Sequence, residues 1–516
     1  MYQDYLPVKL GAVTAVEAIL ALTCVYVAYY GYFVSRRNSM LPPGPKGWPI
    51  VGNLFDMPES FHWLKYYEWS KQYGPIISVR LLGRTIIILS SPKYVSEILE
   101  KRQMVYTERP VFTMVSELVG WDQITVLMPA NTLWKEHRRN FNKLFGTKKT
   151  IQKFYGLEIY ETRRFMRNML RTTDKLEDHI RYWGGSLALQ VSYGYESNNG
   201  HDDLIELVDE AMEQFTILSK PGAFMVDFIP WLKYIPAWFP GATFQRTAQH
   251  YRKTLSDMID VPFQMVKSRL KAGTASQSFT SDLLSADDYT DGKEFALKTS
   301  AATIYAGGAD TTVGLMHGLF LILMLYPEAR KKAQEELDRV VGPERLPNYN
   351  DRENLPYVEA CLKEANRLHT LVPTGGTRVA PKDDIVDGYL IPKGAVIQPL
   401  VWAMLHDPEV YPDPFEFVPE RWLVANPPPH PREMMFGFGR RICPGMVLAD
   451  ASLWIACAMF LALYDINPVK GSPTFFDQSV TGCLDGKFIC HPKPFKSEIK
   501  PRNAKAEALI LSIDNE

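Results

Sequence analysis

The chain has 516 residues, of which 46% are apolar and 22% charged, so one large core is as compatible with its length as several smaller domains. The formal net charge of -1 gives no reason to expect nucleic acid or a strongly acidic partner. Six cysteines without a CxxC pair, and the absence of any Asn-x-Ser/Thr acceptor, favour a reducing compartment for the main body.

The N-terminal segment has the features of a membrane anchor. The stretch from Leu10 to Val34 is apolar apart from Glu17 and a few small polar residues, and as a helix it is long enough to span a bilayer. Arg36 and Arg37 follow directly, whereas a secretory signal has its basic residues first. We therefore expect residues 1–37 to be a single-pass anchor with the rest of the chain cytosolic. A buried core helix is the alternative.

Prolines separate this segment from the main body. Residues 38–53 include LPPGPKGWP, in which a helix cannot continue, so we expect a stiff linker before a single domain over residues 54–516. The stretch from Ile76 to Leu89 is rich in β-branched residues and is interrupted by Gly83, which predicts a hairpin.

Most of the chain from there to residue 340 has helical spacing. Trp134 and Arg138 lie four residues apart and so share one helical face. Taken alone, the pair favours a core tryptophan beside a solvated arginine. Residues 226–241 combine three prolines with several aromatic residues, and we expect a surface that dips into the membrane interface. Residues 271–291 predict a flexible loop.

A long helix is predicted from Glu294 to Tyr326, and it contains the sequence AGGADTT near its middle. The Thr311 hydroxyl can bond back to the carbonyl of Gly307, which would distort the helix and open a groove for a diatomic ligand and a water. Asp310 and Thr311 together form an acid and hydroxyl pair able to relay protons. Close packing of the glycines against another helix is the alternative.

Two charged patterns follow. Glu364 and Arg367 lie one helical turn apart, and Arg421 occurs later within FVPERW; such residues are common on surfaces, where ion pairs contribute little. Arg378 ends an extended segment that begins at Leu371. Residues 389–401 look strand-like around a Pro-Lys-Gly turn, and residues 480–488 predict a hairpin tip.

The stretch FGFGRRICPG, from Phe436 to Gly445, delivers one cysteine to the start of a helix. Pro444 suits a first helical turn, whose free N–H groups and dipole favour ionisation of the Cys443 thiol. A thiolate in that setting is a good iron ligand, and Arg440 or Arg441 would neutralise an acidic cofactor edge. A free cysteine capping a buried helix is the alternative.

This decamer matches the Phe-x-x-Gly-x-Arg-x-Cys-x-Gly signature of the cytochrome P-450 family of haem-thiolate monooxygenases. The resemblance extends from the proline-rich linker to about Arg502, with the motifs in the family's order. It implies a mainly α fold with a minor β-sheet region, and haem b bound through Cys443 as the axial ligand of its iron. The sequences of the anchor, the linker and the segment VYPDPFEFVPERW most resemble those of fungal microsomal members of this family that act on secondary metabolites.

The resemblance also assigns roles to the residues noted above. Asp310 and Thr311 match the oxygen-activation motif. Three residues match a set that locks the loops beneath the haem: Glu364, Arg367 and Arg421. Haem contacts fall on Cys443, Trp134, Arg138, Arg378, Arg441 and Phe436. Relatives often have His before the second propionate-binding arginine, and here that position is Thr377.

The implied function is insertion of one oxygen atom from O2 into an apolar small molecule, such as a terpenoid or aromatic secondary metabolite. Gly437-Phe438-Gly439 lacks the third glycine of a dinucleotide fingerprint, so electrons are expected from an NADPH-dependent flavoprotein reductase on the same membrane. The resemblance implies that this membrane is the endoplasmic reticulum. A haem-thiolate isomerase or dehydratase without a reductase, and a membrane haem sensor, are the alternatives. We expect Tyr305, Val372 and Phe488 to face the substrate pocket.

Overall fold

The structure is a computed structural model that describes residues 39–198, 202–220, 222–471 and 487–513. The expected anchor and most of the expected hairpin tip at 480–488 lie outside these residues. The helices of the described part are α2 (His62–Tyr73), α3 (Pro92–Val95), α4 (Thr132–Phe145), α5 (Lys148–Ile151), α6 (Tyr155–Arg171), α7 (Leu176–Tyr193), α8 (Asp203–Leu218), α9 (Thr243–Lys271), α10 (Phe279–Leu284), α11 (Glu294–Leu325), α12 (Pro327–Val340), α13 (Pro356–Leu368), α14 (Val401–Leu405), α15 (Arg432–Met435), α16 (Met446–Leu463) and α17 (Ala504–Ser512). The strands are β1 (Ile76–Leu81), β2 (Arg84–Leu89), β3 (Arg378–Val379), β4 (Asp384–Val386), β5 (Tyr389–Ile391), β6 (Val396–Pro399), β7 (Tyr464–Pro468) and β8 (Ser497–Pro501).

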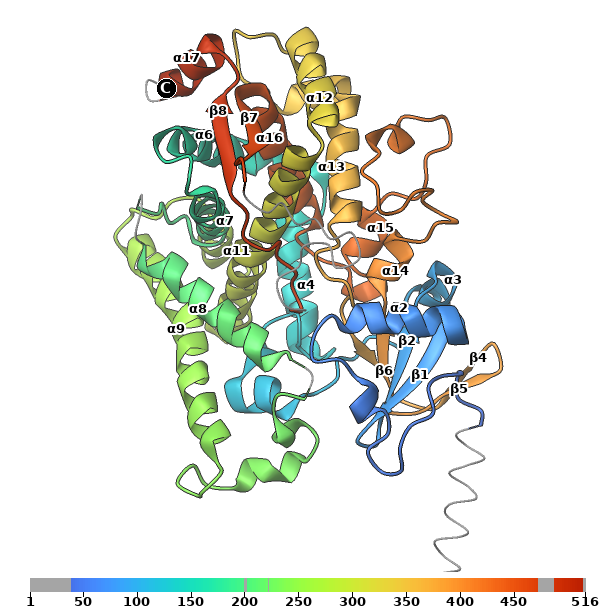
Figure 1. The fold of residues 1–516 in the computed structure, drawn as a ribbon. Coiled ribbons are helices and arrows are strands. Elements are labelled where there is room, and N and C mark those ends of the chain that lie inside the picture. The colour runs from blue at the N-terminus through green and yellow to red at the C-terminus, as the bar shows by residue number, and fades with distance from the viewer. Residues whose placement is uncertain (1–38, 199–201, 221, 472–486, 514–516) are drawn as a thin grey trace, which may run out of the picture.

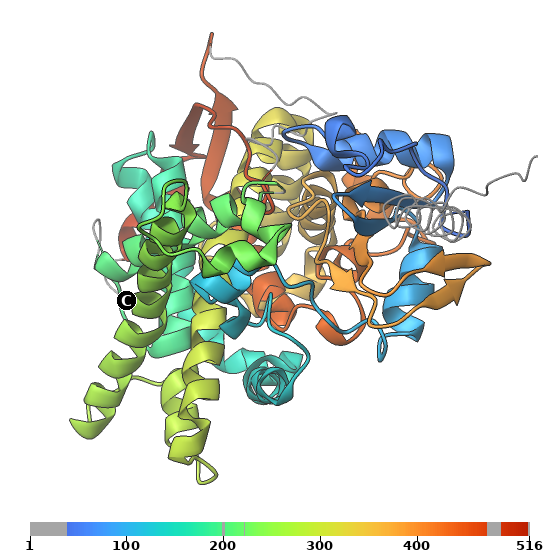
Figure 2. The ribbon, with the colours of Figure 1, turned by 90° about the horizontal axis from the view of Figure 1, so that it is seen from below.

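Helices dominate the fold, as the sequence predicts, and the strands form three small sheets. The largest sheet has the order β1-β2-β6-β3 and lies at one end of the molecule (Figure 1). Figure 2 shows the same division from below, with most helices on one side and the β1-β2 sheet on the other. The predicted hairpin is confirmed, because Ile76 to Leu81 pairs antiparallel with Arg84 to Leu89. Leu82 and Gly83 both have positive φ, at 46° and 83°, as tight two-residue hairpin loops require.

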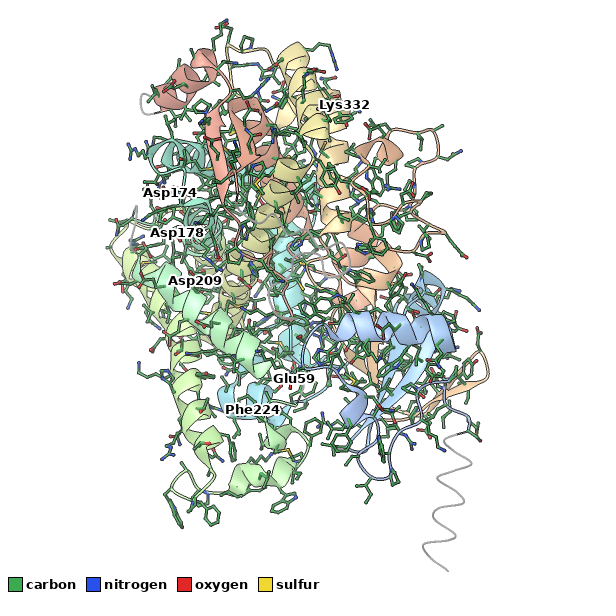
Figure 3. All side chains as sticks on the ribbon, viewed as in Figure 1. Glu59, Asp174, Asp178, Asp209, Phe224 and Lys332 are labelled. Carbon is green, nitrogen blue, oxygen red and sulfur yellow. The ribbon has the colours of Figure 1, made fainter. Side chains whose placement is uncertain are left out.

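Charged side chains cover the outside of the helical part. Figure 3 shows Asp174 and Asp178 at the start of α7 and Lys332 on α12, all of them exposed. Two helices are long and apolar enough to cross a membrane by composition alone: the segment Asp291–Leu325, which includes α11, and Met446–Leu463, which is α16. Most of each is buried by the surrounding protein, so both are core helices of this fold.

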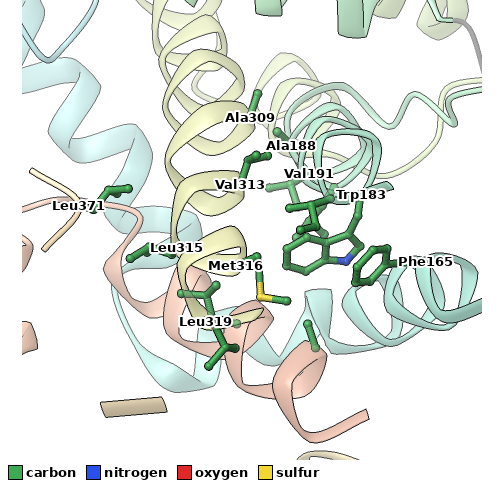
Figure 4. Close-up of a cluster of buried hydrophobic side chains, with 14 of the residues drawn as sticks. Phe165, Trp183, Ala188, Val191, Ala309, Val313, Leu315, Met316, Leu319 and Leu371 are labelled. Carbon is green, nitrogen blue, oxygen red and sulfur yellow. The ribbon is translucent and has the colours of Figure 1, made fainter. Parts of the chain in front are cut away.

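The long helix α11 is the centre of the core. It ends before Pro327, as predicted, because proline cannot continue the hydrogen-bonded ladder. Figure 4 shows Ala309, Val313 and Met316 of α11 packed against Trp183 and Val191 of α7. The rigid packing of α11 on α7 determines which of its faces remains free for a ligand.

One local prediction is confirmed and another needs correction. Residues 389–401 form two strands around the Pro-Lys-Gly turn, as predicted, although β5 pairs with β4 whereas β6 pairs with β2 and β3, and Val401 begins α14. The expected loop at 271–291 contains α10, where Ser278 and Ser281 form a capping box that satisfies the first free N–H groups.

Residues 40–53 lie against β1 of the largest sheet and β5 of the β4-β5 sheet. The backbone N–H of Ser78 donates to the carbonyl of Pro43 at 2.9 Å. The backbone N–H of Leu390 donates to the carbonyl of Met40 at 2.7 Å. Residues 40–53 are therefore attached to the body by backbone hydrogen bonds.

Candidate active site

An apolar cavity of about 330 Å³ lies between α11, α4 and the loop that ends at Cys443. Its walls come from several distant parts of the chain, so only the folded structure assembles it. The lining includes Trp121, Ile124, Trp134, Arg138, Ala306, Gly307, Thr311, Leu371, Val372, Arg378, Phe436, Arg441, Cys443, Phe488 and Ile489. All six residues expected to contact the cofactor are in this lining, as is Thr311.

The loop from Phe436 to Cys443 is held in one shape. The backbone N–H of Cys443 donates to the carbonyl of Phe436 at 2.8 Å. Gly437 and Gly439 have φ of 81° and 55°, a region that side chains disfavour. A Cβ on Gly439 would also lie 2.3 Å from the carbonyl oxygen of Leu99. The glycines of the motif are thus required for the backbone turn that brings the cysteine to the cavity.

The environment of the Cys443 thiol differs from the expectation. Burial raises its pKa above the ordinary value, although the backbone N–H groups of Gly445 and Met446 and the charge of Arg138 act to lower it. The predicted N–H donors are present, but without a cation at the sulfur the loss of hydration outweighs them. A bound metal ion would reverse this balance, because it stabilises the thiolate directly.

Four arginines line the cavity: Arg109, Arg138, Arg378 and Arg441. No Asp or Glu is among the described residues that line it. Burial lowers the pKa of Arg378 to about 9 and of Arg441 to about 10, and the charge of Arg441 adds to the effect on Arg378. Arg109 has its pKa lowered by burial and by both of these neighbours, and its Nε has no hydrogen-bond partner.

Such a cluster of buried cations requires anions. Charged groups are rarely buried without a counter-charge, because desolvation is expensive. A flat apolar ligand with two carboxylates at one edge would supply the missing charge, and Cys443 on another wall would supply a metal ligand. The residues present therefore fit haem, with its iron at the sulfur and its propionates at the arginines.

Helix α4 contributes Trp134 and Arg138 to the same wall. The side chain of Asn131 caps the helix by accepting from the N–H of Trp134 at 2.9 Å. Arg138 donates to the carbonyl of Ile442 at 2.8 Å, next to the cysteine. The guanidinium of Arg441 lies 4.5 Å from the centre of the Trp134 ring and donates to the carbonyls of Thr107 and Met128. These contacts connect α4 to the cysteine loop.

Thr311 and Gly307 form the α11 wall of the cavity. The Thr311 hydroxyl donates to the carbonyl of Gly307, as predicted. The predicted helix distortion is absent, because α11 runs as an unbroken α-helix through the motif. A Cβ on Gly307 would meet nothing within 4 Å, whereas one on Gly308 would lie 3.3 Å from Ala188. One glycine thus leaves space toward the cavity, and the other allows close packing on α7.

Asp310 does not line the cavity. Its carboxylate oxygen Oδ1 lies 3.0 Å from Nε2 of His491, in a nearly buried pair on the side of α11 next to the C-terminal segment. Burial alone would raise the pKa of Asp310, but the hydrogen bond and charge of His491, helped by Arg181 and Lys487, lower it below its ordinary value. Asp310 is therefore held as a carboxylate next to Thr311 in the sequence.

The three residues expected to lock the loops are brought together. Arg367 binds Glu364 through Nη2 at 2.9 Å, and Arg421 Nε lies 3.0 Å from the same carboxylate. Arg367 also donates to the carbonyls of Leu405 and Pro414 at 2.9 and 2.7 Å. The network fastens α13 to the long segment that precedes the cysteine loop.

Of the three residues expected to face the substrate pocket, two do so. Val372 and Phe488 line the cavity, but Tyr305 does not, because it is fully buried and its hydroxyl donates to the carbonyl of Leu204 on α8. Sequence reasoning missed Arg109 and His491. Neither has a local signal, since each acquires its role only from contacts with residues far away in the chain.

Comparison with known proteins agrees with this geometry. Residues 42–499 match the family described as cytochrome P-450. The chain is 42% identical over 499 residues to cytochrome P-450 monooxygenase 208 of Postia placenta, which covers 96% of each chain. It is 38% identical to monooxygenase claR of Ampulloclitocybe clavipes, over 98% of this chain and 94% of that one. Monooxygenase ppsD of Aspergillus oryzae is 39% identical over 96% of both.

Proposed function

This chain belongs to the cytochrome P-450 family, and on that premise we propose that it inserts one oxygen atom from O2 into an apolar small molecule of secondary metabolism. As a member of the family, it is an oxidoreductase that incorporates molecular oxygen and binds haem b through a cysteine thiolate.

One observation supports the assignment most strongly. Cys443, the cluster of arginines and Thr311 occupy different walls of a single apolar cavity. We assign Cys443 as the iron ligand, and Arg138, Arg378 and Arg109 as partners of the propionates. Arg441 and Phe436 support the cofactor from the cysteine loop, and Trp134 packs beside them. Haem supplies the reductive activation of O2 when it is bound.

The chain's own residues control protons and water. In this proposal the Asp310 carboxylate takes up a proton and passes it to the Thr311 hydroxyl, which rotates away from the Gly307 carbonyl and donates into the cavity. The apolar lining excludes other water from the site, so protons arrive through this pair. A monooxygenase needs such control, because reduced oxygen that leaves early is lost as hydrogen peroxide.

The lining also indicates the class of substrate. Side chains such as Trp121, Ile124, Val372 and Phe488 provide apolar and aromatic surface, and the cavity contains no described carboxylate. An apolar terpenoid or aromatic metabolite matches this surface.

Electrons would come from an NADPH-dependent reductase. The solvent face of α4 exposes Lys135, Arg139 and Lys143, while Arg138 of the same helix lies at the cavity wall. A basic face backed by the cofactor site suits an acidic flavoprotein that docks transiently and transfers electrons over a short distance.

Membrane attachment is supported by an exposed aromatic surface. Trp231, Tyr234 and Trp238 are 66%, 78% and 79% exposed in the segment that follows α8. The carbonyl of Asp227 accepts from Arg84 of β2, so this segment and the sheet lie at the same end of the molecule (Figure 1). Tryptophan and tyrosine favour the membrane interface. We propose that this surface rests on the endoplasmic reticulum membrane, with residues 1–37 as the anchor and the catalytic domain in the cytosol.

Expression with a reductase tests the function. Cells that make the chain should accumulate an oxidised apolar metabolite that is absent from cells making Cys443→Ala. The purified wild type should show the thiolate-type Soret band of its carbon monoxide complex, and the variant should lack it. Cys457→Ala, a buried cysteine on α16, is the matched control and should retain both. A Cys443→Ala protein with the unchanged band would exclude the assigned ligand. Product formation without NADPH would instead indicate an isomerase or dehydratase.

A further inference from the structure

The pair formed by Asp310 and His491 links two parts of the chain beside the cavity. Nε2 of His491 lies 3.0 Å from Oδ1 of Asp310, and the two side chains are only 8% and 12% exposed. His491 follows two residues that line the cavity, Phe488 and Ile489. The segment is fastened by the N–H of Cys490, which donates to the carbonyl of Leu371 at 2.8 Å. The imidazole is therefore held in place from both sides.

Charged groups from three other elements face this pair. Arg181 on α7 and Lys487 lower the pKa of Asp310, and Asp209 on α8 (Figure 3) is close enough to be affected by the charge of Asp310. Burial raises the pKa of Asp209 to about 6, and the charge of Asp310 adds to that rise. Asp209 itself is partly exposed to solvent.

Two further histidines face His491. Burial lowers the pKa of His317 and of His369 to about 3, so both imidazoles are neutral near pH 7. They contribute no charge to Asp310 at that pH.

We propose that His491 is a positioning residue for proton delivery: its Nε2–H holds the Asp310 carboxylate in the orientation from which Asp310 serves Thr311. The inference rests on the proposed function. The carboxylate takes one proton from solvent on the Asp209 side and passes one to the Thr311 hydroxyl, so it returns to its ionised form. Stability alone is a weaker explanation, because buried ion pairs often add little to it.

Substitutions at His491 separate the hydrogen bond from the imidazole. His491→Leu removes the donor, whereas the amide of His491→Gln keeps an N–H near the position of Nε2. Each full-length variant is assayed in microsomes with reductase, and peroxide released per NADPH oxidised is measured at equal content of carbon monoxide complex. Because a hydrogen bond to a charged group is lost, we expect His491→Leu to slow proton delivery about tenfold and to raise the peroxide fraction. His491→Gln should behave like the wild type.

The double variant with Asp310→Asn tests whether His491 acts through Asp310. The double variant should release no more peroxide than Asp310→Asn alone. Thermal unfolding of the wild type, the two single variants and the double variant should show non-additive changes in Tm. His317→Leu is the matched control. It removes another buried imidazole, but this one stacks on the ring of Phe495 and makes no hydrogen bond to Asp310. Its peroxide fraction should stay at the wild-type value.

Three results would overturn the inference: a wild-type peroxide fraction in His491→Leu, a fraction in His491→Gln as high as in His491→Leu, or additive effects in the double variant. If His491→Leu lacks the carbon monoxide band, His491→Asn replaces it, because its shorter amide does not reach Asp310. A wild type without that band or without reductase-driven NADPH oxidation would instead refute the proposed function.

Discussion

Arg367 and Glu364 form a two-point ion pair in the interior, with Nη2–Oε1 at 2.9 Å and Nε–Oε2 at 3.0 Å, and both side chains are fully buried. Glu364 also accepts from the indole N–H of Trp422 and the backbone N–H of Val418, at 3.0 and 3.1 Å. One carboxylate thus satisfies donors from two distant segments, and its removal would leave the buried guanidinium without a counter-charge.

Glu364→Gln should therefore destabilise the fold by about 3–5 kcal/mol, the usual effect of breaking a buried pair. Chemical unfolding followed by circular dichroism measures the loss. Glu68→Gln is the control, because Glu68 pairs with Lys65 at the same i,i+3 spacing on the surface. That change should alter stability by less than about 1 kcal/mol. Equal effects of the two substitutions would show that burial of the pair is unimportant.

Gly439→Ala should reduce haem incorporation, because the new Cβ would lie 2.3 Å from the Leu99 carbonyl in a backbone with positive φ. The haem content of purified protein measures the effect. Gly388→Ala provides the comparison, since Gly388 has φ of 82° but open space around it. It should cost about 1–2 kcal/mol of stability from backbone strain and leave haem binding intact. Normal haem content in Gly439→Ala would refute the requirement for glycine in the loop.

Thr311→Ala should keep the Soret band of the carbon monoxide complex but release more peroxide per NADPH, because the hydroxyl that donates into the cavity is gone. Losses of about a hundredfold in product rate are typical when a proton-transfer group is removed. Thr311→Ser retains the hydroxyl and should remain close to the wild type. Undiminished coupling in Thr311→Ala would remove the relay role.

Glu158 gives a pH prediction. It is fully buried on α6, and burial raises its pKa from 4.5 to about 8, although a hydrogen bond from Tyr349 opposes the rise. The folded state therefore binds this proton more tightly than the unfolded state. The resulting stability is complete below about pH 4.5 and is lost as the pH rises to about 8.

Glu158→Gln, which remains neutral, should lose less stability than the wild type between about pH 5 and pH 8. The difference in Tm between the two proteins at each pH removes contributions from other groups. Parallel curves would mean that the Glu158 carboxyl titrates in the folded protein as it does in the unfolded chain.

Local chemistry determined much of what the sequence alone could establish. The FGFGRRICPG loop, the helix stopped by Pro327 and the hairpin with Gly83 each depend on the dihedral preferences and hydrogen bonds of neighbouring residues. Those preferences act in any context, so these elements could be predicted. Residues 389–401 were predicted correctly as strand-like, but the pairing partners of the two strands there, β5 and β6, depend on distant parts of the chain.

Only the tertiary structure decided which distant groups meet. Arg109 joins the arginine cluster and His491 holds Asp310 because the packing of α11, α4 and the C-terminal segment brings them there, and neither residue has a distinctive sequence pattern. The thiol of Cys443 illustrates the same limit. Its N–H donors were predictable from the following helix, but the burial that raises its pKa comes from every wall of the cavity. Desolvation is a property of the whole fold, and no short stretch of sequence contains it.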